Sequence, residues 1–153
     1  MAHSDAARPL APALGVADAD AEQRCARVRA LWAHVQARDW AAMRACYHDR
    51  AKMIWPCSGE RLLDADAIVR VNSLYPEGWS LRIVSVNALA DGRVHSVVEV
   101  RHPPQRFYAN SVFHFDAGRV AEVEEYWATV EAPPAWRSAA VVGAYQRFEE
   151  PSP

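Results

Sequence analysis

Residues 93–130, RVHSVVEVRHPPQRFYANSVFHFDAGRVAEVEEYWATV, decide the fold. β-Branched and aromatic residues dominate the stretch, and turn-forming residues interrupt it twice, at 102–105 and at 116–119. Strand formers separated by short turns predict three consecutive strands that pair as an antiparallel meander. The stretch therefore predicts a sheet whose strands follow one another along the chain.

One polar row is expected to cross this sheet. From the loop lengths, the numbers of facing residues sum to about 209 across the first hairpin and about 235 across the second. This register places Glu99 opposite Asn110 and Asn110 opposite Glu125, and because side chains alternate between faces, all three project from one side. Their neighbours on that side are Arg101, Tyr108 and Trp127 in one adjoining row and Val97, Val112 and Val123 in the other.

We interpret the polar row as the lining of a pocket. Valines and large aromatic side chains beside the two acids would be costly to leave in water. The alternative is a solvated face, the ordinary reason for glutamates at alternate positions of a strand. The opposite face is apolar too, so both faces are expected to be covered; it carries Val94, Val98, Val100, Phe107, Phe113 and Phe115.

The N-terminal part of the chain predicts helices that cover this sheet. Apolar residues recur at helical spacing over 21–38, with Asp20 as a fair N-cap. Shorter helices are expected at 40–48 and at 67–74. The expected organisation is a disordered leader over 1–20, an α+β domain over 21–137, and a tail or short helix over 138–153.

Two further strands are expected between the helices and the meander. A short strand at 52–57 is restricted to an edge or an end of the sheet by Pro56. Trp55 beside it either lines the pocket or packs in the core. A longer strand is expected at 79–89, before a hairpin turn.

Composition narrows the function classes. The chain has 153 residues, enough for one domain with its own core, and its net charge of −2 offers no basic patch for nucleic acid. Three cysteines without CxxC spacing suggest reduced thiols in the cytoplasm. No apolar run fits a signal peptide or a membrane span, so no membrane partner is expected. His95 and His114 face each other in the expected register, but without a third ligand nearby we predict no metal site.

The order of these elements resembles the SnoaL-like branch of the nuclear transport factor 2-like superfamily. The resemblance covers residues 22–137 and is most specific over 116–127, DAGRVAEVEEYW, a D-x-G-[KR]-[IV] turn followed by an acid and two aromatics. It implies an α+β fold, a cone-shaped roll whose N-terminal helices pack on a strongly curved, mostly antiparallel sheet. It also implies a pocket for a small-molecule ligand and, often, a homodimer formed through the outer face of the sheet. Known activities include cyclisation, isomerisation, dehydration and epoxide hydrolysis, beside non-catalytic binding domains.

Two residues carry the resemblance to one group of these enzymes. Glu99 resembles the strand carboxylate of the limonene epoxide hydrolase relatives, and Glu125 resembles their second acid. Those enzymes have an arginine two residues before the first acid, where this sequence has Val97.

Two carboxylates flanking an amide would suit acid–base catalysis without a cofactor. In a partly apolar pocket, desolvation and mutual repulsion raise carboxyl pKa values, so one glutamate can act as an acid and the other as a base. The candidate catalytic residues are Glu99, Glu125 and Asn110, and the candidate substrate-binding residues are Trp55, Arg101, Tyr108 and Trp127. Three functions stay open: an isomerase, cyclase or hydrolase acting on a small apolar or ring-containing molecule, a non-catalytic pocket for such a molecule, or a dimerisation module that uses the apolar face.

Overall fold

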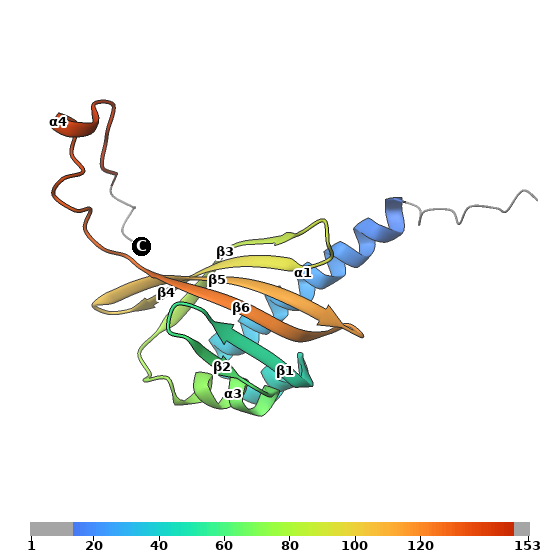
Figure 1. The fold of residues 1–153 in the computed structure, drawn as a ribbon. Coiled ribbons are helices and arrows are strands. Elements are labelled where there is room, and N and C mark those ends of the chain that lie inside the picture. Colours follow the sequence, from blue (N-terminus) through green and yellow to red (C-terminus); the bar gives the residue numbers. More distant parts are fainter. Residues whose placement is uncertain (1–13, 149–153) are drawn as a thin grey trace, which may run out of the picture.

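The computed structural model describes residues 14–148, which form a single six-stranded sheet with helices packed against it (Figure 1). The helices are α1 (Leu14–Ala37), α2 (Trp40–Ala45), α3 (Ala65–Leu74) and α4 (Ala139–Val142). The strands are β1 (Tyr47–Trp55), β2 (Glu60–Leu62), β3 (Ser80–Ala88), β4 (Val94–His102), β5 (Gln105–Asp116) and β6 (Arg119–Thr129). Their order is β2-β1-β6-β5-β4-β3, and every neighbouring pair is antiparallel except β1 and β6. The predicted α+β fold with N-terminal helices on a mostly antiparallel sheet is confirmed.

The inner face of the sheet packs against the helices. Helix α1 lies on β3 and β4, and α3 lies on β1. Positions 28, 31, 32 and 35 of α1 are buried, which is the spacing of one helical face. Trp32 from this stripe meets Phe113 of β5 edge to face, with ring centroids 6.3 Å apart. The core therefore lies between α1 and the face of the sheet that carries Phe113.

The opposite side of the sheet, called here the outer face, carries the alternate residues of each strand. Its side chains on β4, β5 and β6 are half-buried or exposed, apart from Glu99. The face with Phe107 and Phe113, which the sequence predicted as a dimer contact, is instead the inner face and is covered by α1. The face that was expected to line the pocket is therefore the outer face, and the face that was expected to form a dimer contact packs against the helices.

Helix α1 is longer than expected. It begins at Leu14, so residues 14–20 are helical rather than part of a leader, and Asp20 lies inside the helix instead of capping it. Residues 1–13 of the expected leader lie outside the described residues. At the other end of the helical region, α2 stops at Ala45 instead of reaching position 48, because the chain enters β1 at Tyr47 and buries that ring.

Strand β1 is an interior strand, although an edge or end position was expected for it. It lies between β2 and β6. Pro56 comes one residue after its last position, so the missing proline N–H removes no hydrogen bond from the ladder. The expectation failed because the strand starts well before Lys52 and ends before the proline.

The first hairpin of the meander has a tighter loop than expected. Only Pro103 and Pro104 separate β4 from β5, and Glu99 faces Tyr108 rather than Asn110. The shift of two residues keeps these side chains on one face but moves them to different rows. His95 faces Val112 and not His114, so the two histidines do not form the expected pair.

The second hairpin contains a β-bulge that reverses the face of Glu125. At the turn, Asp116 pairs with Arg119 and Phe115 faces Val120, both as expected. His114, however, faces Glu122, which leaves Ala121 as an extra residue in β6. Beyond the bulge, Asn110 faces Tyr126 and Ser111 faces Glu125. Glu125 therefore projects from the inner face, whereas Glu99 and Asn110 project from the outer face. The predicted row Glu99–Asn110–Glu125 does not exist.

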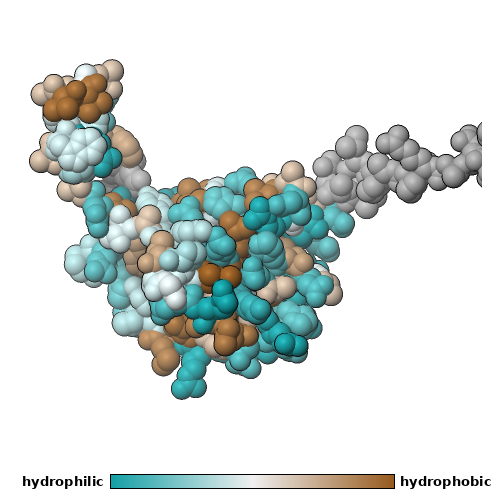
Figure 2. Space-filling view, in the orientation of Figure 1, coloured by the Kyte–Doolittle hydropathy of each residue, from teal (hydrophilic) through white to brown (hydrophobic). Residues whose placement is uncertain are grey.

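After β6 the chain leaves the body of the domain as an arm, residues 131–148, which ends beyond helix α4 (Figure 1). Figure 2 shows apolar surface at the tip of this arm, apart from the rest of the protein. Trp136, Val141 and Phe148 are 68%, 71% and 81% exposed.

No helix in the described part of the chain has the length and apolar character that a membrane crossing needs. All three cysteines are free thiols.

Candidate functional site

A cavity of about 540 Å³ lies between the helices and the inner face of the sheet, within the usual size range of small-molecule sites. Six aromatic rings contribute to its wall. The rings come from α1, the end of β1, the loop before β3, and strands β5 and β6; they are Trp32, Trp55, Tyr75, Trp79, Phe107 and Trp127. Such a wall fits an apolar or ring-containing molecule.

A second, much smaller cavity of about 20 Å³ adjoins the first. The two share Trp32, Val35, Asn72 and Trp127 in their walls. Glu125 lines the smaller cavity. A carboxyl group thus lies in a small cavity that adjoins the aromatic one.

The Glu125 side chain is buried and held by hydrogen bonds to both of its oxygens. Trp55 donates its indole N–H to Oε1 over 3.1 Å, and the Ser111 hydroxyl donates to Oε2 over 2.7 Å. Burial raises the pKa of the Glu125 carboxyl above its ordinary value, and hydrogen bonds from Ser111, Trp55 and Trp127 only partly offset that effect. A protonated carboxyl is therefore available at a higher pH than for an exposed glutamate.

Tyr47 lies near this carboxyl and is also fully enclosed. Burial, and then the charge of Glu125, raises the pKa of the Tyr47 hydroxyl. The phenol therefore stays neutral under ordinary conditions and adds a second polar group to the smaller cavity.

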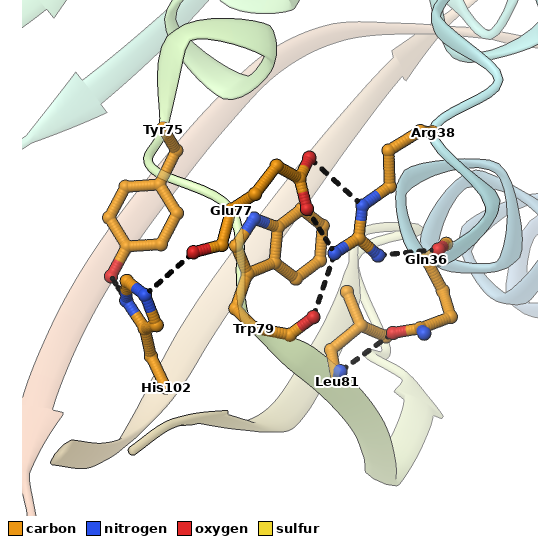
Figure 3. Close-up of polar contacts among 7 residues, drawn as sticks. All are labelled: Gln36, Arg38, Tyr75, Glu77, Trp79, Leu81 and His102. Carbon is orange, nitrogen blue, oxygen red and sulfur yellow. Dashed lines mark hydrogen bonds and ion pairs between the residues drawn. The ribbon is translucent and has the colours of Figure 1, made fainter. Parts of the chain in front are cut away.

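The loop between α3 and β3, residues 75–79, forms one side of the larger cavity and is fixed by polar contacts (Figure 3). Arg38 forms an ion pair with Glu77 at 2.9 Å and donates a hydrogen bond to the backbone oxygen of Trp79 over 2.7 Å. Tyr75 and His102 hydrogen-bond each other through the hydroxyl and Nδ1, 3.1 Å apart. These contacts hold two aromatic residues of the cavity wall, Tyr75 and Trp79, against the rest of the domain.

Glu99 lies in a different environment, on the outer face. Its side chain is fully buried beneath three arginines, with distances of 2.8 Å to Arg82, 3.1 Å to Arg101 and 3.5 Å to Arg106. Burial alone would raise the pKa of this carboxyl, but the hydrogen bonds and charges of Arg82 and Arg101 outweigh it and hold the pKa below its ordinary value. Glu99 is an ionised partner of the arginines and does not reach the cavity.

Three of the seven predicted site residues come together at the cavity: Glu125, Trp55 and Trp127. The other four, Glu99, Asn110, Arg101 and Tyr108, belong to the outer face. Ser111, the partner of Glu125, was not predicted, because the expected register placed Asn110 in its position. One signal for the correct register was present in the sequence. Val120 and Val123 are both apolar, but residues three apart in a regular strand point to opposite faces, so burying both on one face requires a bulge between them.

Within residues 14–148, no cluster of three or more His, Cys, Asp and Glu side chains has a geometry that could hold a metal ion. The polar groups of the smaller cavity are one carboxyl, one phenol and the amide of Asn72.

Comparison with known proteins gives a family for the chain. The model of the SnoaL-like domain matches residues 28–123. No curated protein matches the sequence. The match begins within α1 and ends just after the bulge of β6.

Similar solved structures share this fold. A candidate ketosteroid isomerase from Kribbella flavida has a TM-score of 0.75 and 23% identity, over 86% of this chain and 93% of that chain. An NTF-2 like protein of unknown function from Burkholderia xenovorans has a TM-score of 0.70 and 22% identity, over 84% and 97%. An LEH-like epoxide hydrolase from M. tuberculosis has a TM-score of 0.58 and 17% identity, over 71% and 84%.

Proposed function

The chain belongs to the SnoaL-like domain family, and from that premise and its cavity we propose that it is a cofactor-independent acid–base enzyme for a small ring-containing molecule. In this proposal Glu125 exchanges the proton and the aromatic wall holds the ring. The observation that carries the proposal is the position of Glu125, a buried carboxyl with a raised pKa in a small cavity that adjoins the aromatic one. A carboxyl group tuned towards neutral pH is suited to general acid–base catalysis.

With Glu125 as the proposed proton-exchanging group, isomerisation is the simplest reaction of this class. The Glu125 carboxylate would take a proton from a carbon between a carbonyl and a carbon–carbon double bond, which leaves a dienolate, and would return the proton to the far carbon of that double bond. The double bond moves, no atom is gained or lost, and no oxidant or reductant is needed. The names of the Kribbella and M. tuberculosis proteins fit proton-transfer chemistry in such a cavity, but these proteins share only the fold with this chain.

The carboxyl retains room for a ligand. An ionised carboxylate has about four lone-pair positions, and hydrogen bonds from Trp55, Ser111 and Trp127 occupy three of them. A ligand proton could therefore approach a free position while the three donors hold the group in place. The same three donors would stabilise the carboxylate once the ligand proton has left it.

Binding without chemistry is the second candidate function. The observation that favours it is that both oxygens of Glu125 already accept hydrogen bonds from the protein, as in a purely structural buried carboxyl. In that case the same aromatic cavity would hold the same class of molecule unchanged.

Proton exchange in D₂O distinguishes the two functions without knowledge of the natural substrate. The probe is 2-tetralone, a bicyclic ketone with acidic protons beside its carbonyl, and the readout is loss of those proton signals by NMR. We expect the wild-type protein to accelerate exchange above buffer, and Glu125→Gln to lower the catalysed rate by about 100-fold or more. The glutamine keeps the shape and one of the two acceptor oxygens, and the Ser111 hydroxyl can turn to accept from the amide NH2, so the cavity should survive.

Glu99→Gln is the matched control, because it removes the other buried carboxyl of the sheet but lies on the outer face. Its exchange rate should stay within about twofold of wild type. An equal loss in both variants, or an undiminished rate in Glu125→Gln, would remove Glu125 from the reaction. Ligand-dependent signals from 2-tetralone with no accelerated exchange in wild type would favour binding alone.

Pairing of two copies through the outer face is part of this proposal. The face has a basic corner, Arg82, Arg101 and Arg106, and an acidic edge on β6, Glu122 and Glu124. A two-fold axis between them would set the basic corner of each copy on the acidic edge of the other. Light scattering tests this: Val112→Glu, in the middle of the face, should give a monomer, whereas Leu63→Glu, an exposed site outside it, should leave a dimer. A wild-type monomer would rule the pairing out.

A further inference from the structure

Glu60 is an exposed carboxylate in the wall of the large cavity. It pairs with Trp55 across β1 and β2, and two residues that face each other in an antiparallel pair carry their side chains on the same face. Trp55 lines the same cavity and donates its indole N–H to Glu125. Because Glu60 is both exposed and part of the wall, it lies where the cavity opens, and a ligand can reach its carboxylate.

The Glu60 carboxylate also has free acceptor positions. The hydroxyl of Ser58, another residue of the wall, donates to Oε2, and no other group within residues 14–148 donates to either oxygen. A carboxylate has about four lone-pair positions, so most of them stay available to a ligand. Arg61, the next residue, projects from the opposite face of β2, because side chains alternate along a strand.

The charges in the cavity walls are acidic. In the described chain the charged side chains of the two walls are Glu60 and Glu125, and neither wall includes Lys, Arg or His. Arg38 stacks on the Trp79 ring but is not part of the wall, and Glu77 balances its charge in an ion pair at 2.9 Å (Figure 3). A carboxylate or phosphate ligand would meet two acids and no base, which disfavours it, whereas a cation would be attracted.

The aromatic rings of the wall favour a cation as well. The face of an aromatic ring carries partial negative charge, and a cation within about 6 Å of the ring centroid is attracted to it. Tyr75 and Trp127 of the wall are 38% and 42% exposed, so a ligand can reach these rings. Trp79 already forms one such contact, because the guanidinium carbon of Arg38 lies 3.5 Å from its ring centroid.

We infer that the ligand of this cavity is a ring-containing amine in its protonated form, with the ammonium group bound to Glu60 and the ring held by the aromatic side chains. This inference rests on the proposed function, since it names the substrate class of the same cavity. The Trp55 side chain links the two carboxyl groups, because its backbone faces Glu60 and its N–H meets Glu125. A bicyclic amine could therefore place its ammonium group at Glu60 and a ring carbon near Glu125.

An amine and a neutral ketone with the same bicyclic ring test this directly. The amine is 2-aminotetralin, which is protonated at neutral pH as a lysine side chain is, and the ketone is 2-tetralone. Titration calorimetry gives their dissociation constants for the wild type and for Glu60→Gln, which keeps the shape of the side chain but removes its charge. We expect the wild type to prefer the amine by about fivefold, the order expected for one partly exposed ion pair. In Glu60→Gln the preference should fall to about onefold, with the affinity for 2-tetralone unchanged.

Glu22→Gln is the matched control, because it removes the same charge from an exposed position outside both cavity walls. Glu22 lies about 15 Å along α1 from Trp32, the first residue of that helix in the wall of the large cavity. The variant should keep the preference for the amine. If it lost that preference as Glu60→Gln does, the overall charge of the protein and not Glu60 would select the amine, and the inference would be wrong.

A second readout uses the wild type alone. Added salt screens an ion pair that is open to solvent, so the affinity for 2-aminotetralin should fall as the salt concentration rises, whereas the affinity for 2-tetralone should not. Equal affinities for the two probes in the wild type, or the same amine preference in wild type and Glu60→Gln, would overturn this inference and leave the proposed function standing. Failure of both probes to bind the wild type would overturn the two together.

Discussion

Two buried glutamates of one sheet titrate in opposite directions because of what surrounds them. Glu125 has neutral hydrogen-bond donors and apolar walls, so burial raises the pKa of its carboxyl. Glu99 is equally shielded from solvent, but by three arginines near the surface, so the pKa of its carboxyl is lowered. The opposite pKa shifts of the two carboxyls therefore follow from what covers each one, apolar walls for Glu125 and arginines for Glu99.

This difference predicts opposite pH dependences of stability. A carboxyl whose folded-state pKa is raised stabilises the fold fully below the unfolded pKa of about 4.3, and that contribution is lost as the pH rises through the folded pKa. Glu125→Gln has no carboxyl at this position and so cannot lose this contribution. The melting temperature of the variant relative to that of wild type should therefore rise as the pH goes from acid to neutral. Thermal melts across the acid-to-neutral range measure the trend.

Glu99→Gln should show the reverse sign. Its carboxyl has a lowered folded-state pKa, so its contribution is present above the unfolded pKa and is lost as the pH falls through the folded pKa. The variant should be less stable than wild type by about 1–3 kcal/mol at neutral pH, and the gap should narrow in acid. Parallel pH trends in the two variants would contradict the assignment of the two environments.

At the level of elements, the turn and bulge at the start of β6 decide which side chains meet. Ala117 and Gly118 form the turn with φ of 46° and 77°, the left-handed region. A left-handed conformation costs an L-residue such as alanine about 1–2 kcal/mol, whereas asparagine tolerates it better and is preferred before glycine in such hairpins. Ala117→Asn should therefore raise the free energy of unfolding by about 0.5–1 kcal/mol, measured by urea denaturation.

Ala117→Val supplies the comparison, since a β-branched side chain is least tolerant of that backbone conformation. It should lower the stability below that of the wild type. If the three proteins unfold at the same urea concentration, the turn does not store the strain assigned to Ala117.

The elements and the fold class could be predicted from the sequence because they depend on local patterns. The meander follows from strand formers separated by two short turns, and its existence is confirmed. The site depends on strand register, because a shift of one residue moves a side chain to the opposite face of the sheet. The extra residue Ala121 places Glu125 on the inner face, whereas Asn110 stays on the outer face. The apolar pair Val120 and Val123 hinted at the bulge, but no local pattern linked Ser111 to Glu125 or Arg38 to Trp79.

At the scale of the whole molecule, the described chain divides into a domain that ends with β6 and an arm that adds nothing to the core. Every member of the buried apolar cluster and of its half-buried neighbours lies at or before Val123. The backbone N–H of Val130 still donates to the Arg106 oxygen over 2.9 Å, which closes the end of the sheet. Both cavities likewise take their walls from residues up to Thr129. The structural boundary of the domain therefore falls near residue 130, a few residues before the boundary at 137 expected from the sequence.

Truncation after Glu131 tests this boundary. Because the arm buries no apolar side chain of the core, its removal should leave the melting temperature within about 2 °C of the full chain, less than the shift that 1 kcal/mol produces in a domain of this size. Binding of 2-tetralone should also be unchanged, since the cavity walls are complete without the arm. A truncation after Tyr126 serves as the comparison: it removes Trp127 and the final pairs of β5 with β6, and it should lose both stability and binding. If truncation after Glu131 already produced that loss, residues beyond β6 would have to pack on the domain, and the division drawn at residue 130 would be wrong.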